Sequence, residues 1–289
     1  MNMSTVFSYD EAFSRNIGWV TTDEQEILRN KRIAIAGMGG VGGFHLLTLA
    51  RLGIGKFNIA DLDTFELANF NRQTGASLST LDRPKVEVLA EMARDINPEC
   101  DLAIYPQGVN EANLQAFFQD VDLYIDGLDF FAFDARERVF SHCAHHGIPA
   151  VTVAPLGMSA ALLNFLPGGM SFEDYFQLAS LPELEKAVRF LVGLAPALLH
   201  RHYLADKTRV NLKERRGPST VMACQLCAGV VGCETLKILL QRGKVWTAPH
   251  GIQFDGYRNK LAHTWRPGGN RNPLNRLAIA IAMKQLGLE

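Results

Sequence analysis

The sequence predicts an α/β fold built on a doubly wound, mostly parallel β-sheet. Short apolar runs alternate with amphipathic segments over residues 22–154, and buried parallel strands read as continuous apolar runs. Strands separated by helices imply right-handed crossovers. A glycine-rich turn, AGMGGVGG at residues 36–43, joins the first apolar run to the first amphipathic one. Together these observations indicate a Rossmann-like core.

The alternating segments define the elements of this core in order. Helices are expected over residues 22–30, 41–53, 84–96, 110–119 and 133–146. Strands are expected over residues 32–36, 56–61, 101–105, 121–126, 148–154 and 158–169. The first helix should begin at a capping box running from Thr22 to Gln25, and Asn97-Pro98 should end the third.

The regular alternation of strands and helices ends after residue 154. The segment from Ser171 to Thr220 is long and mostly helical or irregular, a helix is expected at 224–240, and a hairpin at 251–267. We therefore expect one domain in three parts. Residues 1–166 form the core with an N-terminal helical arm, 167–222 a long crossover insert, and 223–289 a C-terminal helix and β extension. The insert has three interpretations: additional core, a lid over the substrate, or a dimer contact.

Composition limits the function classes. The 289 residues are 47% hydrophobic and 20% charged, and the formal net charge is −1. With so little net charge, the protein as a whole is not expected to attract nucleic acid or a membrane surface electrostatically. Five cysteines without a secretory signal indicate reduced thiols and a cytoplasmic protein. The tail after Tyr257 is rich in arginine and lysine. This tail is either a solvated basic face or a docking surface for an acidic partner, so tRNA stays open as a partner.

The glycine turn is suited to bind phosphate. Gly37, Gly39, Gly40 and Gly42 lack Cβ atoms, so the backbone can turn tightly and approach a phosphate closely, and the following helix offers free N–H groups. Asp61, at the end of the second strand, is placed to bind a ribose hydroxyl. Up to this point an NAD(P)- or flavin-dependent oxidoreductase and an ATP-dependent enzyme look alike.

The stretch that follows separates the two classes. A nicotinamide site needs one acidic residue here, yet the chain adds Asp63, Asn69, Arg72 and Lys85. Arginine can clamp phosphate oxygens in a fork and lysine supplies a point charge, which suits a triphosphate. Asp129 ends a D-G-L-D run after the fourth strand, where its carboxylate could hold Mg²⁺. The sequence therefore favours Mg²⁺ and ATP over a dinucleotide.

Five motif blocks in this order resemble the ThiF/MoeB/ubiquitin-activating superfamily of adenylating enzymes. The blocks are GMGGVGG, DLD, NFNRQ, RPKVE and DGLD, and the resemblance covers about residues 10–166. It continues more weakly through the helix near Glu234 and the last strands. The stretch F-S-R-N at residues 13–16, in the N-terminal arm, is a sixth and shorter block of the same resemblance.

The resemblance implies a role for each matching residue. Asp61 would bind the ATP ribose, Asn69 and Arg72 the phosphates, and Lys85 a phosphate. Asp129 would organise Mg²⁺. Arg15, from F-S-R-N, would reach the γ-phosphate, often across the interface of a homodimer.

The implied reaction is adenylation of a carboxylate. The carboxylate, at the C-terminus of a carrier protein or peptide or on a modified tRNA, attacks the α-phosphate of ATP, pyrophosphate leaves, and an acyl-adenylate forms. Positioning and charge neutralisation would supply most of the catalysis. Two alternatives are an oxidoreductase, which leaves Asn69, Arg72, Lys85 and Asp129 without a common role, and a non-catalytic peptide-binding member of the superfamily. The latter predicts damage to the ATP-binding set, and the sequence has none.

The sequence also departs from the family. Many members hold zinc with two C-x-x-C pairs, but this chain has one, Cys224 and Cys227, and a closed zinc site needs four ligands. Structural zinc is therefore not expected. These cysteines and Cys233 either pack in the core or act as reactive thiols. Residues 171–222 contain no cysteine, which does not support a covalent relay through the insert. His142, Cys143, His145 and His146 form either a helix-end polar cluster or a metal site.

Overall fold

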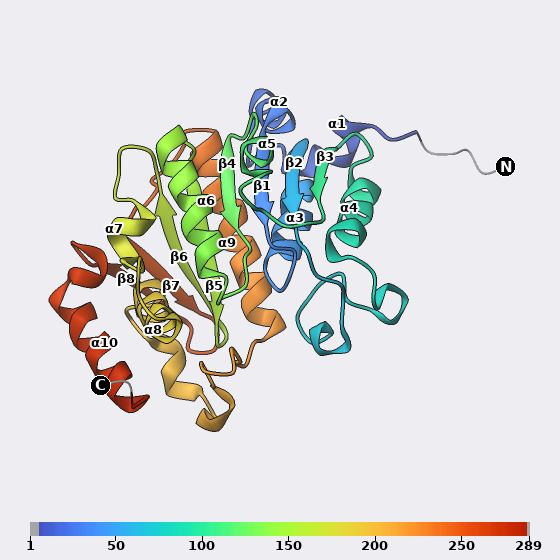
Figure 1. Cartoon of the computed structure of the whole chain (residues 1–289). Coiled ribbons are helices and arrows are strands. Elements are labelled where there is room, and N and C mark those ends of the chain that lie inside the picture. Colours follow the sequence, from blue (N-terminus) through green and yellow to red (C-terminus); the bar gives the residue numbers. More distant parts are fainter. Residues whose placement is uncertain (1–5, 288–289) are drawn as a thin grey trace.

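The computed structural model in Figure 1 describes residues 6–287, which form a single eight-stranded sheet in the order β3-β2-β1-β4-β5-β6-β7-β8. The parallel strands are β1 (Arg32–Ala36), β2 (Lys56–Ala60), β3 (Asp101–Tyr105), β4 (Leu123–Asp126) and β5 (Ala150–Leu156). The antiparallel strands are β6 (Ser159–Phe165), β7 (His250–Asp255) and β8 (Lys260–Trp265). The predicted doubly wound, mostly parallel sheet is confirmed.

Helices cover both faces of the sheet (Figure 1). One face carries α3 (Gly42–Arg51), α4 (Lys85–Ile96) and α9 (Val221–Leu239), and the other α6 (Phe133–His146). Alternation along β1 produces two cores: Ile33 and Ile35 pack under α3 and α9, while Ala34 and Ala36 face the aromatic residues under α6. Because successive side chains of a strand point to opposite faces of the sheet, this alternation divides the core into a part under α3 and α9 and a part under α6.

The N-terminal arm contains α1 (Tyr9–Ala12), a short 3₁₀ turn (Ser14–Asn16) and α2 (Thr22–Asn30). The predicted capping box is one residue out of register. Thr21 is the N-cap: its hydroxyl accepts from the Glu24 N–H at 3.1 Å, and the Glu24 carboxylate accepts from the Thr21 N–H at 2.8 Å. Gln25 is unavailable for this role because its buried amide donates to the Leu52 carbonyl at 3.0 Å.

The helix expected over 110–119 is reduced to α5 (Leu114–Phe117). Two asparagines hold the preceding residues in turns instead. The Asn110 side chain accepts from the Ala112 N–H at 3.0 Å, and the Asn113 side chain accepts from the Asn110 N–H at 2.8 Å and donates to the Gly108 carbonyl at 2.7 Å. Such local bonds compete with helical ones.

The crossover insert adds to the core. Its helices are α7 (Phe172–Phe176) and α8 (Glu183–Leu194), and their aromatic side chains join the cluster under α6. Phe172, Tyr175, Phe176 and Phe190 are each at most 2% exposed. The interpretation of the insert as additional core therefore holds for α7 and α8, whereas residues 205–217 are mostly exposed.

The C-terminal extension includes a helix that the sequence analysis missed, α10 (Pro273–Gln285). Asn272 caps it through a hydrogen bond from the Leu274 N–H at 3.1 Å, and Pro273 occupies the first turn. Ile279 packs against Val188 and Val192 of α8. The predicted hairpin is present as β7 and β8, so the extension continues the main sheet.

Helix α9 is long and apolar enough, by length and composition, to cross a membrane, and it is the single such helix among the described residues. It packs instead on α3, β5 and β6. Cys224, Cys227 and Val231 belong to the main hydrophobic core. Helix α9 is therefore a core helix of this fold.

Candidate nucleotide site

Two glycine turns meet where the strand order reverses between β1 and β4. Gly37, which follows β1, has a φ of +89°, and a Cβ there would lie 2.1 Å from the Gly127 carbonyl oxygen, which follows β4. A Cβ on Gly42 would lie 1.7 Å from the Gly37 oxygen. The carboxyl ends of parallel strands at such a reversal form the ligand crevice of doubly wound sheets.

Two backbone N–H groups in the middle of the glycine turn are free among the described residues. The N–H groups of Gly39 and Gly40 donate no hydrogen bond to any residue between 6 and 287. They precede the first turn of α3, whose N-terminus carries a partial positive charge. A Cβ on Gly39 would have only the Gln73 amide nitrogen, at 3.7 Å, within reach. These two glycines therefore leave N–H groups available to an anion.

Asp61 lies directly beside this turn. Its carboxylate accepts hydrogen bonds from the Met38 N–H at 2.5 Å and from the Asp63 N–H at 2.8 Å. Burial raises the pKa of Asp61, and the two backbone hydrogen bonds oppose that rise. Each oxygen keeps a further lone pair, so the carboxylate can still accept a hydroxyl.

Lys85 and Asp63 form an ion pair at the edge of the turn. Lys85 is the first residue of α4, and its Nζ lies 3.0 Å from an Asp63 carboxylate oxygen. The Lys85 side chain is 8% exposed, while that of Asp63 is 58% exposed. The nearly buried Lys85 ammonium is thus paired with the Asp63 carboxylate, which is mostly exposed to solvent.

Asn69 and Arg72 come from the loop between β2 and α4. The Asn69 carbonyl oxygen accepts from the Glu66 N–H at 3.0 Å, which leaves its amide NH₂ to point elsewhere. Arg72 donates to the Ala68 carbonyl at 2.9 Å, and its Cδ lies 3.9 Å from a Cβ position on Gly40. The Arg72 side chain therefore lies beside the glycine turn, and Asn69 lies three residues earlier in the same loop.

Gln73 is a site residue to which the sequence analysis assigned no role. It is 7% exposed, its amide nitrogen approaches Gly39, and its carbonyl oxygen is buried without a hydrogen-bond partner among the described residues. A buried acceptor without a partner is costly. The position of Gln73 directly after Arg72 in N-F-N-R-Q was the available signal.

Asp129 is exposed at the end of the loop that follows β4. One of its carboxylate oxygens accepts from the Phe131 N–H at 2.9 Å. Arg136 of α6 holds this loop: it donates to the carbonyls of Leu128 at 2.8 Å and Asp129 at 2.9 Å. Its Nε also pairs with the buried Asp126 carboxylate at 2.8 Å. Arg136 is a second residue that the sequence analysis did not identify.

Arg15 does not join this group within one chain. The neighbouring Asn16 donates to the Leu52 carbonyl at 3.2 Å, and Tyr9 donates to the Gly53 carbonyl. Both carbonyls follow the C-terminal end of α3, whereas the glycine turn precedes its N-terminal end. Ten residues of α-helix span about 15 Å, so Arg15 lies on the far side of α3 from its expected phosphate.

The cysteines and histidines have separate environments. Cys224 and Cys227 are buried, as apolar packing predicts, and burial raises the pKa of both thiols. Cys233 is exposed, so the packing alternative does not hold for it and the reactive-thiol alternative stays open. Cys143 points into the core, while His142 stacks on Phe118. Within residues 6–287 no three histidine, cysteine or acidic side chains are grouped to hold a metal.

The residues present fit ATP and Mg²⁺. The glycine turn has free N–H groups with Arg72 beside it, Lys85 lies in the ion pair next to Asp61, and Asp129 keeps one carboxylate oxygen free of protein hydrogen bonds among the described residues. Mg²⁺ in nucleotide sites usually takes one or two carboxylates and completes its shell with phosphate oxygens and water. A single exposed aspartate therefore suffices on the protein side.

Comparison with known proteins defines the class. The model of the ThiF family matches residues 13–276. This chain belongs to the ThiF family.

Curated relatives fall into two groups. The chain is 34% identical over 141 residues to a tRNA threonylcarbamoyladenosine dehydratase of Bacillus subtilis, covering 48% of this chain and 55% of that protein. It is 32% identical over 143 residues to the molybdopterin-synthase adenylyltransferase of Escherichia coli, covering 50% of this chain and 57% of that protein. The chain thus spans little more than half the length of the curated relatives it matches.

Solved structures share the fold. PaaA superposes with a TM-score of 0.67 at 19% identity, covering 92% of this chain and 77% of that one. Escherichia coli MccB with ATP superposes with a TM-score of 0.62 at 19% identity, covering 83% of this chain and 65% of that one. At this identity the likeness concerns the fold alone.

Proposed function

We propose that this protein is an ATP-dependent adenylyltransferase that activates a carboxylate as an acyl-adenylate. The observations that support the proposal are the hydrogen bond from the Met38 N–H of the glycine turn to Asp61, the position of Arg72 beside Gly40, and the close approach of Gly127, in the loop before Asp129, to Gly37. Lys85 is linked to Asp61 through Asp63, and Asn69 lies in the same loop as Arg72. Membership of the ThiF family and similarity to an adenylyltransferase support the same activity. An oxidoreductase would leave the two cations and Asp129 without a role.

Each residue then has one task. Asp61 orients the ribose, the Gly39 and Gly40 N–H groups and Asn69 hold phosphate oxygens, and Arg72 and Lys85 neutralise the charge that develops on departing pyrophosphate. Bound Mg²⁺, held by Asp129, would supply further charge neutralisation. The carboxylate attacks the α-phosphorus, its oxygen forms the new P–O bond, and the bond to the pyrophosphate oxygen breaks.

Lys85 changes partners in this scheme. Without nucleotide its ammonium is neutralised by Asp63. A triphosphate carries more negative charge than one carboxylate, so phosphate displaces Asp63 from the lysine. Asp63, which is mostly exposed, returns to water at little cost. The pair thus keeps a nearly buried cation stable until ATP arrives.

We propose a homodimer in the cytoplasm as the working form. Arg15 lies on the far side of α3 from the site of its own chain and forms no ion pair with any residue from 6 to 287. A second copy is required to bring this arginine to a γ-phosphate. The carboxylate substrate is the C-terminus of a carrier protein or peptide. A carboxylate on modified tRNA is a second candidate, because similar proteins are named tRNA threonylcarbamoyladenosine dehydratases.

Two measurements test the proposal. Mg-ATP should raise the melting temperature and NAD should not; stabilisation by NAD alone would contradict adenylation. Pyrophosphate release is then screened over carrier proteins, peptides and modified tRNA. With the substrate found, Asp129→Ala and Arg72→Ala should each lower the rate of ATP–pyrophosphate exchange about a hundredfold or more. Both side chains are at least partly exposed, so the melting temperature of the free protein should change little.

A further inference from the structure

Asn71 lies between the loop that carries Arg72 and the end of the crossover insert. Its side-chain oxygen accepts a hydrogen bond from Arg72 Nη1 at 2.9 Å, and its side-chain nitrogen donates to the Ser219 carbonyl at 3.0 Å. Ser219 stands two residues before α9, directly after the exposed stretch of the insert. One amide thus joins two segments that are 148 positions apart in the chain.

The Arg72 guanidinium is held along one edge. Its Nη1 donates to the Ala68 carbonyl and to the Asn71 side-chain oxygen, both at 2.9 Å. Nη1 carries two N–H groups, so both are used. Nε and Nη2 donate no hydrogen bond to any residue from 6 to 287. These two nitrogens form an edge that can bind two oxygens of one phosphate. Ala68 and Asn71 therefore fix the guanidinium by the edge that a phosphate does not need.

The exposed stretch of the insert, residues 205–217, is anchored before and after. Before it, the Tyr203 hydroxyl accepts a hydrogen bond from the Met158 N–H at 2.8 Å. After it, the Thr220 hydroxyl donates to the Gly157 carbonyl at 2.8 Å. Both partners lie in the turn between β5 and β6, so the two ends of the stretch are held at one turn. The side-chain amide described above then links this anchored stretch to the loop of the nucleotide site.

The exposed stretch is basic. Residues 205–217 contain five lysine and arginine residues and two acidic residues, a net charge of +3, and most of them are exposed. An acidic partner would therefore be attracted to this stretch. Contact there would reach Arg72 through two hydrogen bonds, one at Ser219 and one at Asn71.

We propose that Asn71 is a positioning residue that orients Arg72 and couples it to the end of the crossover insert. Coupling between two sites is reciprocal. A triphosphate that fixes Arg72 should therefore also restrain the stretch at 205–217, and a partner that restrains this stretch should favour ATP. The inference rests on the proposed function, in which Arg72 holds a phosphate, and it adds a route by which the insert controls that arginine.

Calorimetric titration of Mg-ATP tests the positioning role. Asn71→Ala should raise the dissociation constant of ATP about tenfold, because a hydrogen bond to a charged group is lost. The same change made in Arg72→Ala should have no further effect, since Asn71 acts through Arg72. Losses that add in the double variant would contradict this role. Asn71 is exposed, so circular dichroism should show a folded protein.

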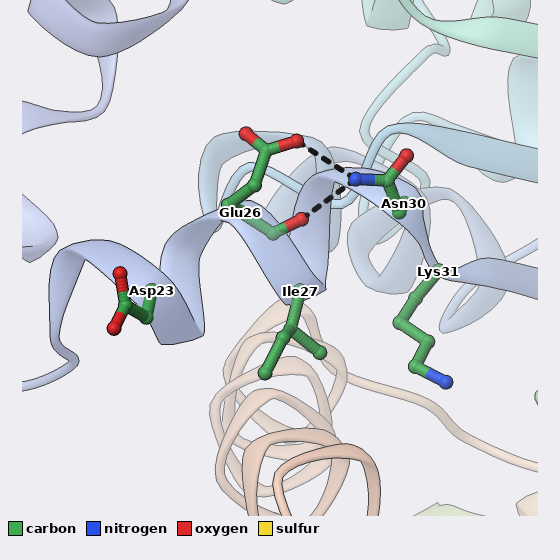
Figure 2. Close-up of a pocket in the computed structure, with 5 residues that line it drawn as sticks. All are labelled: Asp23, Glu26, Ile27, Asn30 and Lys31. Carbon is green, nitrogen blue, oxygen red and sulfur yellow. Dashed lines mark hydrogen bonds between the residues drawn. The ribbon is translucent and has the colours of Figure 1, made fainter.

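Asn30→Ala is the matched control. Figure 2 shows Asn30 on α2, where its amide donates to Glu26 of the same helix, to the backbone carbonyl at 3.0 Å and to the carboxylate at 2.8 Å. This variant also loses hydrogen bonds from an exposed asparagine, but these bonds lie within one helix of the arm. It should bind ATP as the wild type does.

Limited digestion with trypsin tests the coupling to the insert. The five basic residues of the 205–217 stretch are trypsin sites, and mass spectrometry identifies cleavage at each. Saturating Mg-ATP should slow cleavage in the wild type and in Asn30→Ala about fivefold. In Asn71→Ala, at an ATP concentration that saturates this variant too, cleavage should stay at the rate seen without nucleotide. Saturation separates the coupling from the change in affinity.

The outcomes distinguish this inference from the proposed function. Equal protection of wild type and Asn71→Ala, or an unchanged ATP affinity in Asn71→Ala, would overturn the inference and leave ATP binding in place. A wild-type protein that binds no Mg-ATP would contradict the proposed function, and the inference would be wrong with it.

Discussion

The Arg136 guanidinium donates to the backbone carbonyl of Asp129 at 2.9 Å and, through its Nε, to the Asp126 carboxylate at 2.8 Å. It also stacks on Phe190 of α8, with its central carbon 4.6 Å from the ring centre. One buried side chain therefore joins the end of β4, the Asp129 loop and the crossover insert. Arg136 thus fixes the backbone that carries Asp129.

Arg136→Lys should weaken the use of Mg²⁺. Lysine keeps the charge beside Asp126 but lacks the planar fork that reaches several carbonyls. Loss of a positioning partner typically costs 10- to 100-fold in metal affinity. Calorimetric titration of ATP at increasing Mg²⁺ should therefore require about 10 to 100 times more Mg²⁺. Arg138→Lys, on the same helix, is the control and should behave as wild type; an unchanged Mg²⁺ requirement in Arg136→Lys would refute the positioning role.

The glycines of the turn should separate into structural and ligand-binding positions. Gly42→Ala would place a carbon 1.7 Å from the Gly37 oxygen, so we expect the free energy of unfolding to fall by at least about 2 kcal/mol. Gly39→Ala has room, with its nearest neighbour at 3.7 Å. It should keep the wild-type melting temperature and bind ATP at least about tenfold more weakly, because the methyl group occupies the phosphate approach. Chemical denaturation and ATP titration measure the two effects, and unaltered stability of Gly42→Ala would contradict the geometry.

His45 should make the protein sensitive to acid. It is completely buried on α3, neither ring nitrogen has a hydrogen-bond partner among the described residues, and burial lowers its pKa to about 3. The unfolded chain takes up a proton below about pH 6.5, and the folded chain does not until about pH 3. Stability therefore falls as the pH falls through this window, by up to about 1.4 kcal/mol per pH unit.

His45→Leu removes this contribution. The slope of unfolding free energy against pH between about 6 and 4 should be shallower in His45→Leu than in wild type. His145→Leu, at an exposed position, should keep the wild-type slope. Equal slopes for His45→Leu and wild type would show that His45 is protonated in the folded protein.

Complementation between copies tests the source of Arg15. Arg15→Ala and Asp129→Ala homodimers should each be nearly inactive. Mixed by refolding or co-expression, they should recover about a quarter of the wild-type rate, since half the dimers are mixed and each has one intact site. If the Arg15→Ala homodimer is as active as wild type, Arg15 does not belong to the site. If the mixture recovers no activity, Arg15 does not act on the site of the partner chain.

Local patterns predicted the sheet, the glycine turn and most helices because these depend on periodicity and turn chemistry. Helix α10 was missed although Asn272 and Pro273 mark its start, because the many basic residues there were interpreted as a tail. The short α5 was overextended because asparagine side chains compete with the helix, an effect that a period alone does not reveal.

The site was predicted less completely. Asp61, Asn69, Arg72 and Lys85 follow recognisable spacings; Asp61 and Arg72 lie beside the glycine turn, and the roles of all four stay predictions. Gln73 and Arg136 gain their significance from tertiary contacts: the Gln73 oxygen is buried without a partner among the described residues, and the Arg136 guanidinium holds the Asp129 loop and pairs with Asp126, ten residues earlier in the chain. No sequence spacing encodes these. The distance of Arg15 from the turn likewise depends on the length and direction of α3.

The contact between Gly37 and Gly127 has a consequence for how the protein can evolve. The glycine turn and the loop that carries Asp129 touch through backbone atoms, so neither can shift without the other. Changes in substrate must therefore accumulate elsewhere: on the antiparallel half of the sheet, the exposed stretch of the insert and α10. Selection for a new substrate is expected to act on those parts and to leave the contact between the two turns unchanged.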